Sequence, residues 1–514
     1  MARDAGSVAG QAWLRRAFGT HVPTAAVESR IVAGARRTVV REDQTTEFYP
    51  RAYAPAETVR GHLRFALRYE PLDMGVLAAT MKAVDPEAIR QWVLSEPTGE
   101  YSRRAWFFHE TFAGKALDLP NADMGNYVAA LNPEKQLVAR TRKSRRHRVD
   151  DNLLGGSGMC LTVRRTDRLA GQMKLRLDQD AAELVDACDP PLRHRALSYL
   201  YTKETRSSFA IEGERPSERR TARFVAALRA AQTFDPASKQ AFLDLQQEIL
   251  DPRYAATDWR QFQNFVGETV QGYREDVHFV CPRPQDVPGL MAGWMRMTRR
   301  LIAAADTTAR LRPLSPARAD PVVAAALSAF AFVFVHPFED GNGRTHRFLM
   351  HHILARTGYS PAGVIFPVSA AIMRDRPSYD AALESFSKPS MKHVDWAWTT
   401  KGNEIVVRND TADLYRYFDA TAIVEYFYDR VADTVQKDLK DELDFIAIFD
   451  RALAAARSIV DMPDRRLSLF VSLCMQNGGR ISAGKRKAQF PELRDREVAA
   501  MQDAIRAAGQ RDEE

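Results

Sequence analysis

One twelve-residue segment, from His336 to Arg347, holds most of the side chains that could do chemistry, and it reads HPFEDGNGRTHR. Pro337 cannot continue a helix and disfavours the helical region for the residue before it, so we expect a tight loop that begins at His336. Two glycines flank Asn342 and allow backbone conformations in which several N–H groups point to one place. The segment therefore predicts a loop between two helices whose backbone can hold an anion.

The helix that follows this loop adds positive charge at the same place. It begins near Arg344, so the positive end of its dipole faces the loop. Arg344 and Arg347 are three residues apart and share one face of the first turn. The loop backbone, the helix dipole and the two arginines together predict a polyphosphate site.

Two further residues of the segment could supply the rest of the chemistry. Asp340 offers a hard carboxylate oxygen at the rim of the site, which suits Mg²⁺ shared with phosphate oxygens. His336 could take a proton from an incoming hydroxyl. These parts suffice for transfer of a phosphorus-centred group, in which positioning and charge neutralisation do most of the work. A P-loop is excluded, because the sequence contains no G-x-x-x-x-G-K-[ST].

The composition is typical of a folded protein with a full hydrophobic core. The chain has 514 residues, 45% of them hydrophobic and 27% charged, and a formal net charge of +7. Its length allows about two to four domains, and its charge is compatible with polyphosphate or nucleic acid without specifying either. The four cysteines lie far apart without zinc spacing, which disfavours a disulfide scaffold or a structural zinc module. The first thirty residues lack the apolar core of a signal peptide, and no apolar run approaches a membrane span, so we expect a cytoplasmic protein with no membrane contact.

The elements that must position the motif are predominantly helical. Apolar spacing predicts helices directly before and after it, at 321–335 and 344–357, and over most of the chain after residue 169, including 258–270. The one strand-like piece in that part is Val277–Val280. Residues 1–50 have weak periodicity, and we expect an irregular lead-in there, followed by helices between 55 and 114. The predicted fold class is all-α.

Two basic stretches outside the motif could contact a polyanion. Arg140–Arg148 contains six Lys or Arg and His147, and the favoured interpretation is a solvated loop or a face paired with acids. The C-terminal part reads as helix, Asn-Gly-Gly turn, basic segment and helix, which could form a winged-helix-like module. Its candidate phosphate contacts are Arg480, Lys485, Arg486 and Lys487. Nucleic-acid binding there is the less favoured interpretation, and a long helical tract at 411–459 leaves a homodimer open.

The motif matches H-x-F-x-[DE]-G-N-G-R-x-x-R, the signature of the Fic (Fido) family of nucleotidyl transferases, at every fixed position. The resemblance extends over roughly residues 200–390. It implies a helical Fic core with a short β-hairpin flap, and transfer of AMP from ATP to a Ser, Thr or Tyr hydroxyl of a target protein. His336 would then be the general base, and Asp340 would hold Mg²⁺ against the α- and β-phosphates.

The same resemblance assigns the remaining contacts of the site. The residues expected to contact ATP are Asp340, Gly341, Asn342, Gly343, Arg344, Thr345, His346, Arg347, Tyr379 and Asp380. The target-docking flap would begin near Gly272, Tyr273 and Arg274 and include Val277, His278, Phe279 and Val280.

A second pattern lies upstream, where Ser208 to Gly213 reads SFAIEG and fits S/T-x-x-x-E-[GN], the autoinhibitory pattern of the family. The residues independently predict an amphipathic helix at about 192–213 that Gly213 ends, with Ser208 and Glu212 on one face. A carboxylate at a helix C-terminus lies in an unfavourable dipole field and gains from an external cation. The resemblance identifies that cation as Arg347, so the autoinhibitory residues Ser208, Glu212 and Gly213 would block the place of the γ-phosphate.

These observations predict four parts of the chain. They are a partly helical N-terminal region at 1–168, a helical segment with the inhibitory helix at 169–255, a Fic catalytic core at 256–400 and a C-terminal helical module at 401–514. Three alternatives stay open: a DNA- or protein-binding regulator with a Fic core, use of another nucleotide, and removal of AMP from a modified protein by the same residues.

Overall fold

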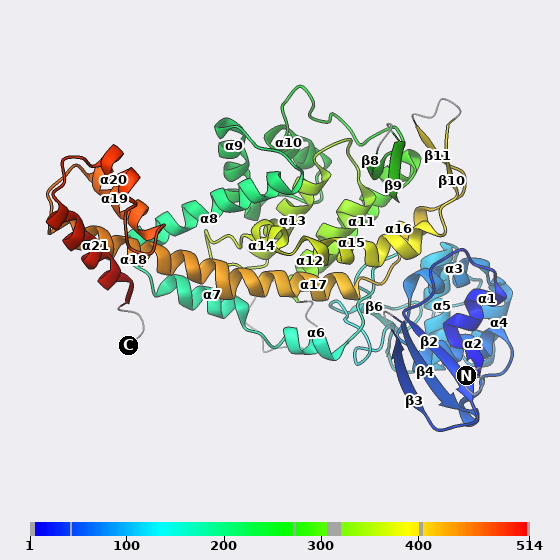
Figure 1. The fold of residues 1–514 in the computed structure, drawn as a ribbon. Coiled ribbons are helices and arrows are strands. Elements are labelled where there is room, and N and C mark those ends of the chain that lie inside the picture. Colours follow the sequence, from blue (N-terminus) through cyan, green and yellow to red (C-terminus); the bar gives the residue numbers. More distant parts are fainter. Residues whose placement is uncertain (1–5, 42–43, 271–273, 306–319, 400–403, 511–514) are drawn as a thin grey trace.

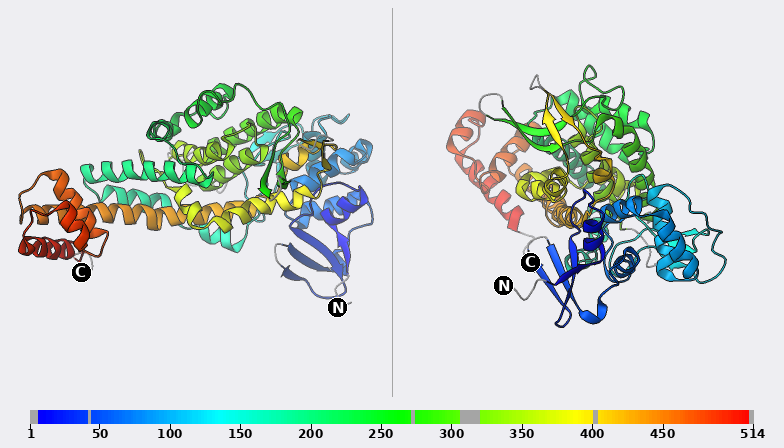
Figure 2. Two further views of the ribbon diagram at one scale, coloured as in Figure 1. Left: turned by 45° about the horizontal axis from the view of Figure 1, so that its top comes forward. Right: turned by 90° about the vertical axis from the view of Figure 1, so that its right-hand side faces the viewer.

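The computed structural model describes residues 6–41, 44–270, 274–305, 320–399 and 404–510. The prediction of a mainly helical fold is confirmed, since 57% of the structure is helical and its sheets are small. A long helical body lies between an N-terminal α/β part and a small C-terminal helical module, which are at opposite ends of the molecule (Figures 1 and 2).

The first fifty residues form a sheet, so the prediction of an irregular lead-in is wrong. Its strand order is β1-β2-β4-β3, with β2 parallel to β4, and the strands are β1 (Ser7–Ala9), β2 (Val27–Val32), β3 (Arg37–Arg41) and β4 (Gln44–Pro50). β1 has only three residues, and β3 is exposed along almost its whole length. Strands of these two kinds do not show the alternation of apolar and polar residues by which a half-buried strand is identified.

Helices cover one side of this sheet and build the first hydrophobic core. They are α1 (Gly10–Ala17), α2 (Val59–Tyr69), α3 (Met74–Ala83), α4 (Pro86–Ser95) and α5 (Glu100–Ala113). Trp92 and Trp106 are fully buried among them. Asp85 caps α4 by accepting a hydrogen bond from Glu87 N (3.0 Å), as its place before Pro86 predicts.

The basic stretch lies on a small sheet after these helices. This sheet consists of β5 (Val128–Ala129), β6 (Arg142–Ser144) and β7 (Val149–Asp151). Arg146 Nε donates to Glu110 Oε2 (2.8 Å), and His147 Nε2 lies 3.0 Å from the same oxygen. The interpretation as a face paired with acids therefore holds for these two residues.

The central core forms around α12 (Pro321–Val335), the helix directly before the motif. All its residues except Pro321 and Val333 are buried, as expected for a helix that is apolar on every face. Asp320 caps it by accepting from Val322 N (2.8 Å) and Val323 N (3.2 Å). Its neighbours are α11 (Val287–Ala305), α13 (Asn342–Arg356), α16 (Ala412–Arg416) and α17 (Thr421–Asp433).

Further helices surround this core. They are α6 (Asp167–Gln172), α7 (Leu177–Asp186), α8 (Pro190–Ile211), α9 (Glu218–Arg229), α10 (Lys239–Ile249), α14 (Val368–Arg374) and α15 (Arg376–Met391). The predicted inhibitory helix is α8. The body also contains two hairpins, β8 (Phe265–Val270) with β9 (Arg274–Val280), and β10 (Trp396–Trp398) with β11 (Ile405–Val407).

The first of these hairpins corrects one expected helix and confirms one strand. Residues 258–270, expected to be helical, contain irregular chain followed by β8, because the backbone of this strand is hydrogen-bonded to β9 and not to a preceding helical turn. Val277–Val280 is part of β9, as predicted. Gly272 and Tyr273 lie outside the described residues.

A single long helical path connects the body to the C-terminal module. It consists of α17, a π-helical segment at Thr434–Leu439 and α18 (Lys440–Arg457), and it leads to α19 (Asp464–Met475), α20 (Ala483–Gln489) and α21 (Asp495–Gln510). Up to residue 510, where the description ends, this module has helices and no strand, so nothing there forms a wing. Among the described helices of the protein, none is both long and apolar enough to cross a membrane.

Leu327 lies fully buried in the middle of α12. We expect Leu327→Ala to lower the melting temperature by about 5 °C or more, because a cavity remains in the centre of the core. Leu94→Ala, at an exposed position of α4, is the matched control and should change it little. Scanning calorimetry measures both, and an unchanged transition in Leu327→Ala would contradict the central place of α12.

Candidate active site

The motif forms a closed loop between α12 and α13. His336 ends α12 with a left-handed backbone (φ 50°), and Gly341 has φ 79° directly before α13. Asn342 Nδ2 donates to Phe338 O (2.9 Å), and Asn342 Oδ1 accepts from Phe338 N (3.0 Å). The Asn342 side chain therefore fixes the shape of the loop, and only its backbone is left for an anion.

The imidazole of His336 has one nitrogen in a hydrogen bond, and the other has no hydrogen-bond partner among the described residues. Nδ1 lies 3.2 Å from Val333 O, a contact that places the proton on Nδ1 and leaves the Nε2 lone pair available. Burial, followed by the nearby charge of Arg260, lowers the pKa of His336 to about 4. The side chain is therefore neutral at physiological pH, which is the form that can accept a proton.

Arg260 holds this loop in place, and no sequence pattern pointed to it. Arg260 is only 4% exposed. Its side chain donates from Nε to His336 O (2.8 Å) and from Nη2 to Pro282 O (2.7 Å). Its backbone N donates to Pro337 O (2.8 Å). Arg260 thus ties the end of α12 to the base of the β8–β9 hairpin.

The structure brings the two predicted patterns together at the start of α13. Arg347 donates from Nε to Ser208 Oγ (2.9 Å), and from Nη2 to Ser208 O and Glu212 Oε1 (both 2.8 Å). A Cβ added to Gly343 would lie 2.2 Å from Glu212 Oε1, so this carboxylate occupies the space that glycine leaves beside the helix N-terminus. Burial alone would raise the pKa of Glu212, but the charge and hydrogen bond of Arg347 bring the pKa below its usual value.

Arg344, the other arginine of the motif, has two carboxylate partners. Its Nη2 lies 3.0 Å from Asp340 Oδ1, and its Nη1 lies 2.9 Å from Glu214 Oε1. Glu214 was missed because it lies outside both patterns. Asp340 is 65% exposed as a side chain and is the accessible carboxylate at the rim.

A metal ion at this rim would need ligands from elsewhere. The described residues contain no group of three or more His, Cys, Asp or Glu that could hold one. The exposed carboxylate of Asp340 fits Mg²⁺ that takes most of its ligands from phosphate oxygens and water.

Two residues expected to contact ATP, Thr345 and His346, have their side chains in the core, and their contact with ATP stays a prediction. His346 is fully buried on the α12 side of α13, with Nδ1 2.8 Å from Ala329 O and its ring against Phe330. Thr345 is also buried, and its Oγ1 lies 3.4 Å from Gln246 Nε2. Successive helical residues point about 100° apart, so neither shares the face of Arg344 and Arg347.

The two residues expected at the base pocket lie in the first turns of α15, close to the end of α8. Tyr379 is buried and lies beside His346, with ring centroids 6.3 Å apart. Asp380 is half-exposed and pairs with Arg376 (3.0 Å), which also donates to Ile211 O (3.2 Å). The start of α15 is thus tied directly to the end of the predicted inhibitory helix.

The predicted flap residues divide into two groups. Phe279 and Val280 are buried, and Val280 O accepts from the Tyr415 hydroxyl (2.6 Å). His278 is exposed and Val277 half-buried. Phe279 and Val280 thus anchor β9 in the core, whereas Val277 and His278 remain accessible at the surface.

A second buried contact, also missed, fixes α8 against α13. Glu204 lies 2.8 Å from His351 Nε2 and accepts from Ser369 N (2.8 Å). Glu204, Ser208 and Glu212 are spaced by four residues, so one stripe of α8 faces α13 along three turns.

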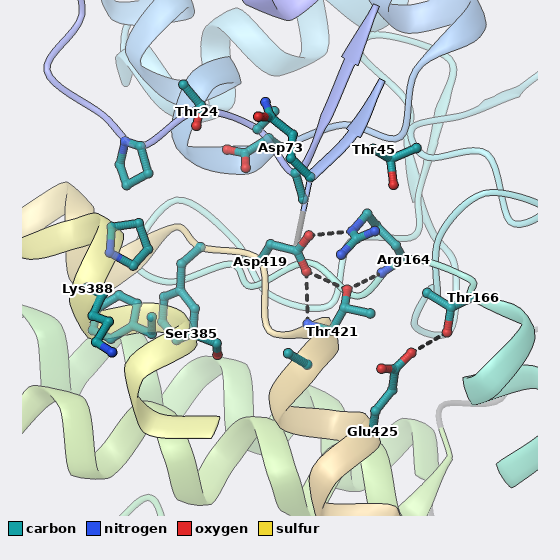
Figure 3. A pocket seen from close by; sticks show the side chains of 18 of the residues that line it. Thr24, Thr45, Asp73, Arg164, Thr166, Ser385, Lys388, Asp419, Thr421 and Glu425 are labelled. Atoms are coloured by element: carbon teal, nitrogen blue, oxygen red, sulfur yellow. Dashed lines mark hydrogen bonds and ion pairs between the residues drawn. The ribbon is translucent and has the colours of Figure 1, made fainter. Parts of the chain in front are cut away.

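The large cleft of the structure lies elsewhere. It has a volume of about 1670 Å³ and separates the N-terminal sheet from α15 and α17. Its charged walls pair internally, as Arg164 does with Asp419 (2.6 Å; Figure 3). None of the predicted site residues lines it.

Comparison with known proteins agrees with the motif. Residues 236–354 match the model of the Fic/DOC family, so the chain contains a Fic domain. Among curated relatives, protein adenylyltransferase fic-1 of Caenorhabditis elegans is 45% identical over 64 residues, covering 12% of this chain and 11% of its own. Protein adenylyltransferase Fic of Nematostella vectensis is 52% identical over 46 residues, covering 9% and 11%, and that of Drosophila melanogaster 55% over 47 residues, covering 9% of both.

The chain thus spans about a tenth of the length of these relatives. Among solved structures, it is similar to a Fic family protein from Desulfovibrio desulfuricans, with a TM-score of 0.36 and 17% identity. That match covers 64% of this chain and 95% of the other.

The environment of His336 predicts that it stays neutral well below its ordinary titration range. An NMR titration of protein with isotope-labelled histidine tests this. The ring resonance of His336, identified by its absence in His336→Gln, should not titrate near pH 6.5 and should begin to shift only below about pH 5. The urea-unfolded protein, whose histidines titrate near about pH 6.5, is the control. A midpoint near 6.5 in the folded protein would contradict the burial argument.

Proposed function

We propose that this protein is a protein adenylyltransferase, which transfers AMP from ATP to a hydroxyl of a target protein. The observation that carries the proposal is the arrangement of the complete motif. The free Nε2 of a neutral histidine stands at one end of the loop, and two buried arginines stand at the helix N-terminus on the other. A base and an anion site on one rigid loop are the two requirements of the reaction.

In the proposed reaction, a Ser, Thr or Tyr hydroxyl of the target attacks the α-phosphorus of ATP. A new O–P bond forms, the bond between the α-phosphorus and its bridging oxygen breaks, and pyrophosphate leaves with the electron pair. His336 Nε2 takes the hydroxyl proton, and Nδ1 stays fixed by Val333 O. Arg344 and Arg347 neutralise the charge that develops on the leaving group.

The remaining residues position the reactants. Asp340 would hold Mg²⁺, which supplies charge neutralisation to the phosphates when bound. The first turns of α15, with Tyr379 and Asp380, are proposed to border the base. The hairpin of β8 and β9, through Val277 and His278, is proposed to receive the target.

We further propose that the contact of Glu212 with Arg347 inhibits the enzyme. The Glu212 carboxylate pairs with Arg347 (2.8 Å) and lies against Gly343 at the helix N-terminus. A phosphate group would need both the arginine and the space, so the carboxylate and the phosphate exclude one another.

Replacing Glu212 should therefore release the activity. We expect Glu212→Gly to raise protein labelling by α-³²P-ATP with Mg²⁺ and cell lysate by about tenfold or more, and Glu212→Gly/His336→Ala to abolish it. Glu218→Gly, a loss of the same charge at an exposed position at the start of α9, should behave as wild type. Incorporation of label from γ-³²P-ATP should be the same with Glu212→Gly as with wild type, because the γ-phosphate leaves with pyrophosphate.

The proposal is contradicted if Glu212→Gly labels no more protein than wild type. It is also contradicted if Glu212→Gly raises incorporation of the γ-label and not of the α-label, because that result would indicate phosphoryl transfer.

The low pKa of His336 also predicts the pH dependence of the released enzyme. A base with a pKa of about 4 stays deprotonated throughout the neutral range, so kcat of Glu212→Gly should be nearly constant from about pH 8 to about pH 6. Single-turnover rates on an identified target measure it. A fall in kcat with a midpoint near pH 6.5 would show that the base has an ordinary histidine pKa.

A further inference from the structure

The turn that ends α8 presents a second carboxylate to the motif, that of Glu214. Gly213 has φ 72°, and hydrogen bonds run from Gly213 N to Ala210 O and from Glu214 N to Phe209 O (both 3.0 Å). These two bonds define a Schellman motif, in which the chain reverses directly after the glycine. As a result, the carboxylates on both sides of Gly213 reach α13.

Each carboxylate contacts a different arginine of the motif. Glu212 Oε1 lies 2.8 Å from Arg347 Nη2, and Glu214 Oε1 lies 2.9 Å from Arg344 Nη1. Both arginine side chains are 1% exposed. A buried guanidinium needs a counter-charge, and here each has a carboxylate from the same turn.

Glu214 is also held from its other side. Arg220, in the first turn of α9, has Nη2 2.8 Å from Glu214 Oε2. The guanidinium groups of Arg220 and Arg344 lie over the ring of Phe209, at 4.8 Å and 5.3 Å from its centroid. Cation–π contacts and the two ion pairs thus join these four side chains in one closed cluster.

We propose that Glu214 is a second determinant of nucleotide affinity, whose carboxylate competes with phosphate oxygens for Arg344 as Glu212 does for Arg347. The inference rests on the proposed function, because it takes Arg344 to be a phosphate ligand. A carboxylate oxygen and a phosphate oxygen are alternative partners of the same guanidinium. Removal of Glu212 alone therefore frees Arg347 and leaves Arg344 paired with Glu214.

The test uses Glu214→Gln in the full-length Glu212→Gly protein, since glutamine keeps the size of the side chain and removes its charge. Titration calorimetry measures Kd for ATP and, separately, for adenosine. We expect Glu214→Gln to lower the Kd of ATP about five- to tenfold and to leave that of adenosine unchanged, because adenosine has no phosphates. KM for ATP should fall with kcat retained. Glu218→Gln in the same background is the matched control.

Three results would overturn the inference. They are an unchanged or weaker affinity for ATP, an equal gain for adenosine, and an equal gain from Glu218→Gln, which would indicate a general charge effect. The binding measurement requires no transfer. Tighter ATP binding without any protein labelling would therefore count against the adenylyltransferase proposal alone, and labelling without a change in affinity would count against the role of Glu214 alone.

Discussion

The contact on which the site depends is the ion pair between Glu212 and Arg347. It joins the C-terminus of α8, where a carboxylate is unfavourable, to the N-terminus of α13, where an anion is favourable. The glycine at 343 provides the space, and Ser208 accepts from Nε of the arginine through its hydroxyl and from Nη2 through its carbonyl. The same features that make this place suitable for a carboxylate make it suitable for a phosphate, which is the physical basis of the proposed inhibition.

The pair in turn requires that α8 be held along its length. Glu204 fixes its middle to α13 and α14, and Lys203 donates to the buried Asp438 (2.7 Å), which also accepts from Arg374. Asp438 lies in the π-helical segment between α17 and α18, and Arg195 pairs with Asp450 of α18. The predicted inhibitory helix therefore contacts the catalytic loop through one face and the path to the C-terminal module through another.

Short-range features of this protein could be predicted from its sequence. Adjacent Pro, Gly and capping residues encode the loop after α12, the start of α13 and the glycine end of α8. The two residues of the Glu212–Arg347 contact belong to two recognisable sequence patterns.

Arg260 and Glu214 could not be predicted, because their partners lie far away in sequence or outside any pattern. The N-terminal sheet was missed for a related reason: β1 has three residues, β3 is exposed, and β2 pairs in parallel with β4, which follows β3 in the sequence. The predicted domain limits and the roles of the site residues stay predictions.

The most direct test is a crystal structure of Glu212→Gly with Mg²⁺ and a non-hydrolysable ATP analogue. The account predicts phosphate oxygens within hydrogen-bond distance of Arg347, in the space beside Gly343 that the Glu212 carboxylate occupies here. The α-phosphorus should face Nε2 of His336. A polyphosphate bound away from the N-terminus of α13, with Arg347 in contact with Ser208 alone, would contradict the claim that carboxylate and phosphate share one site.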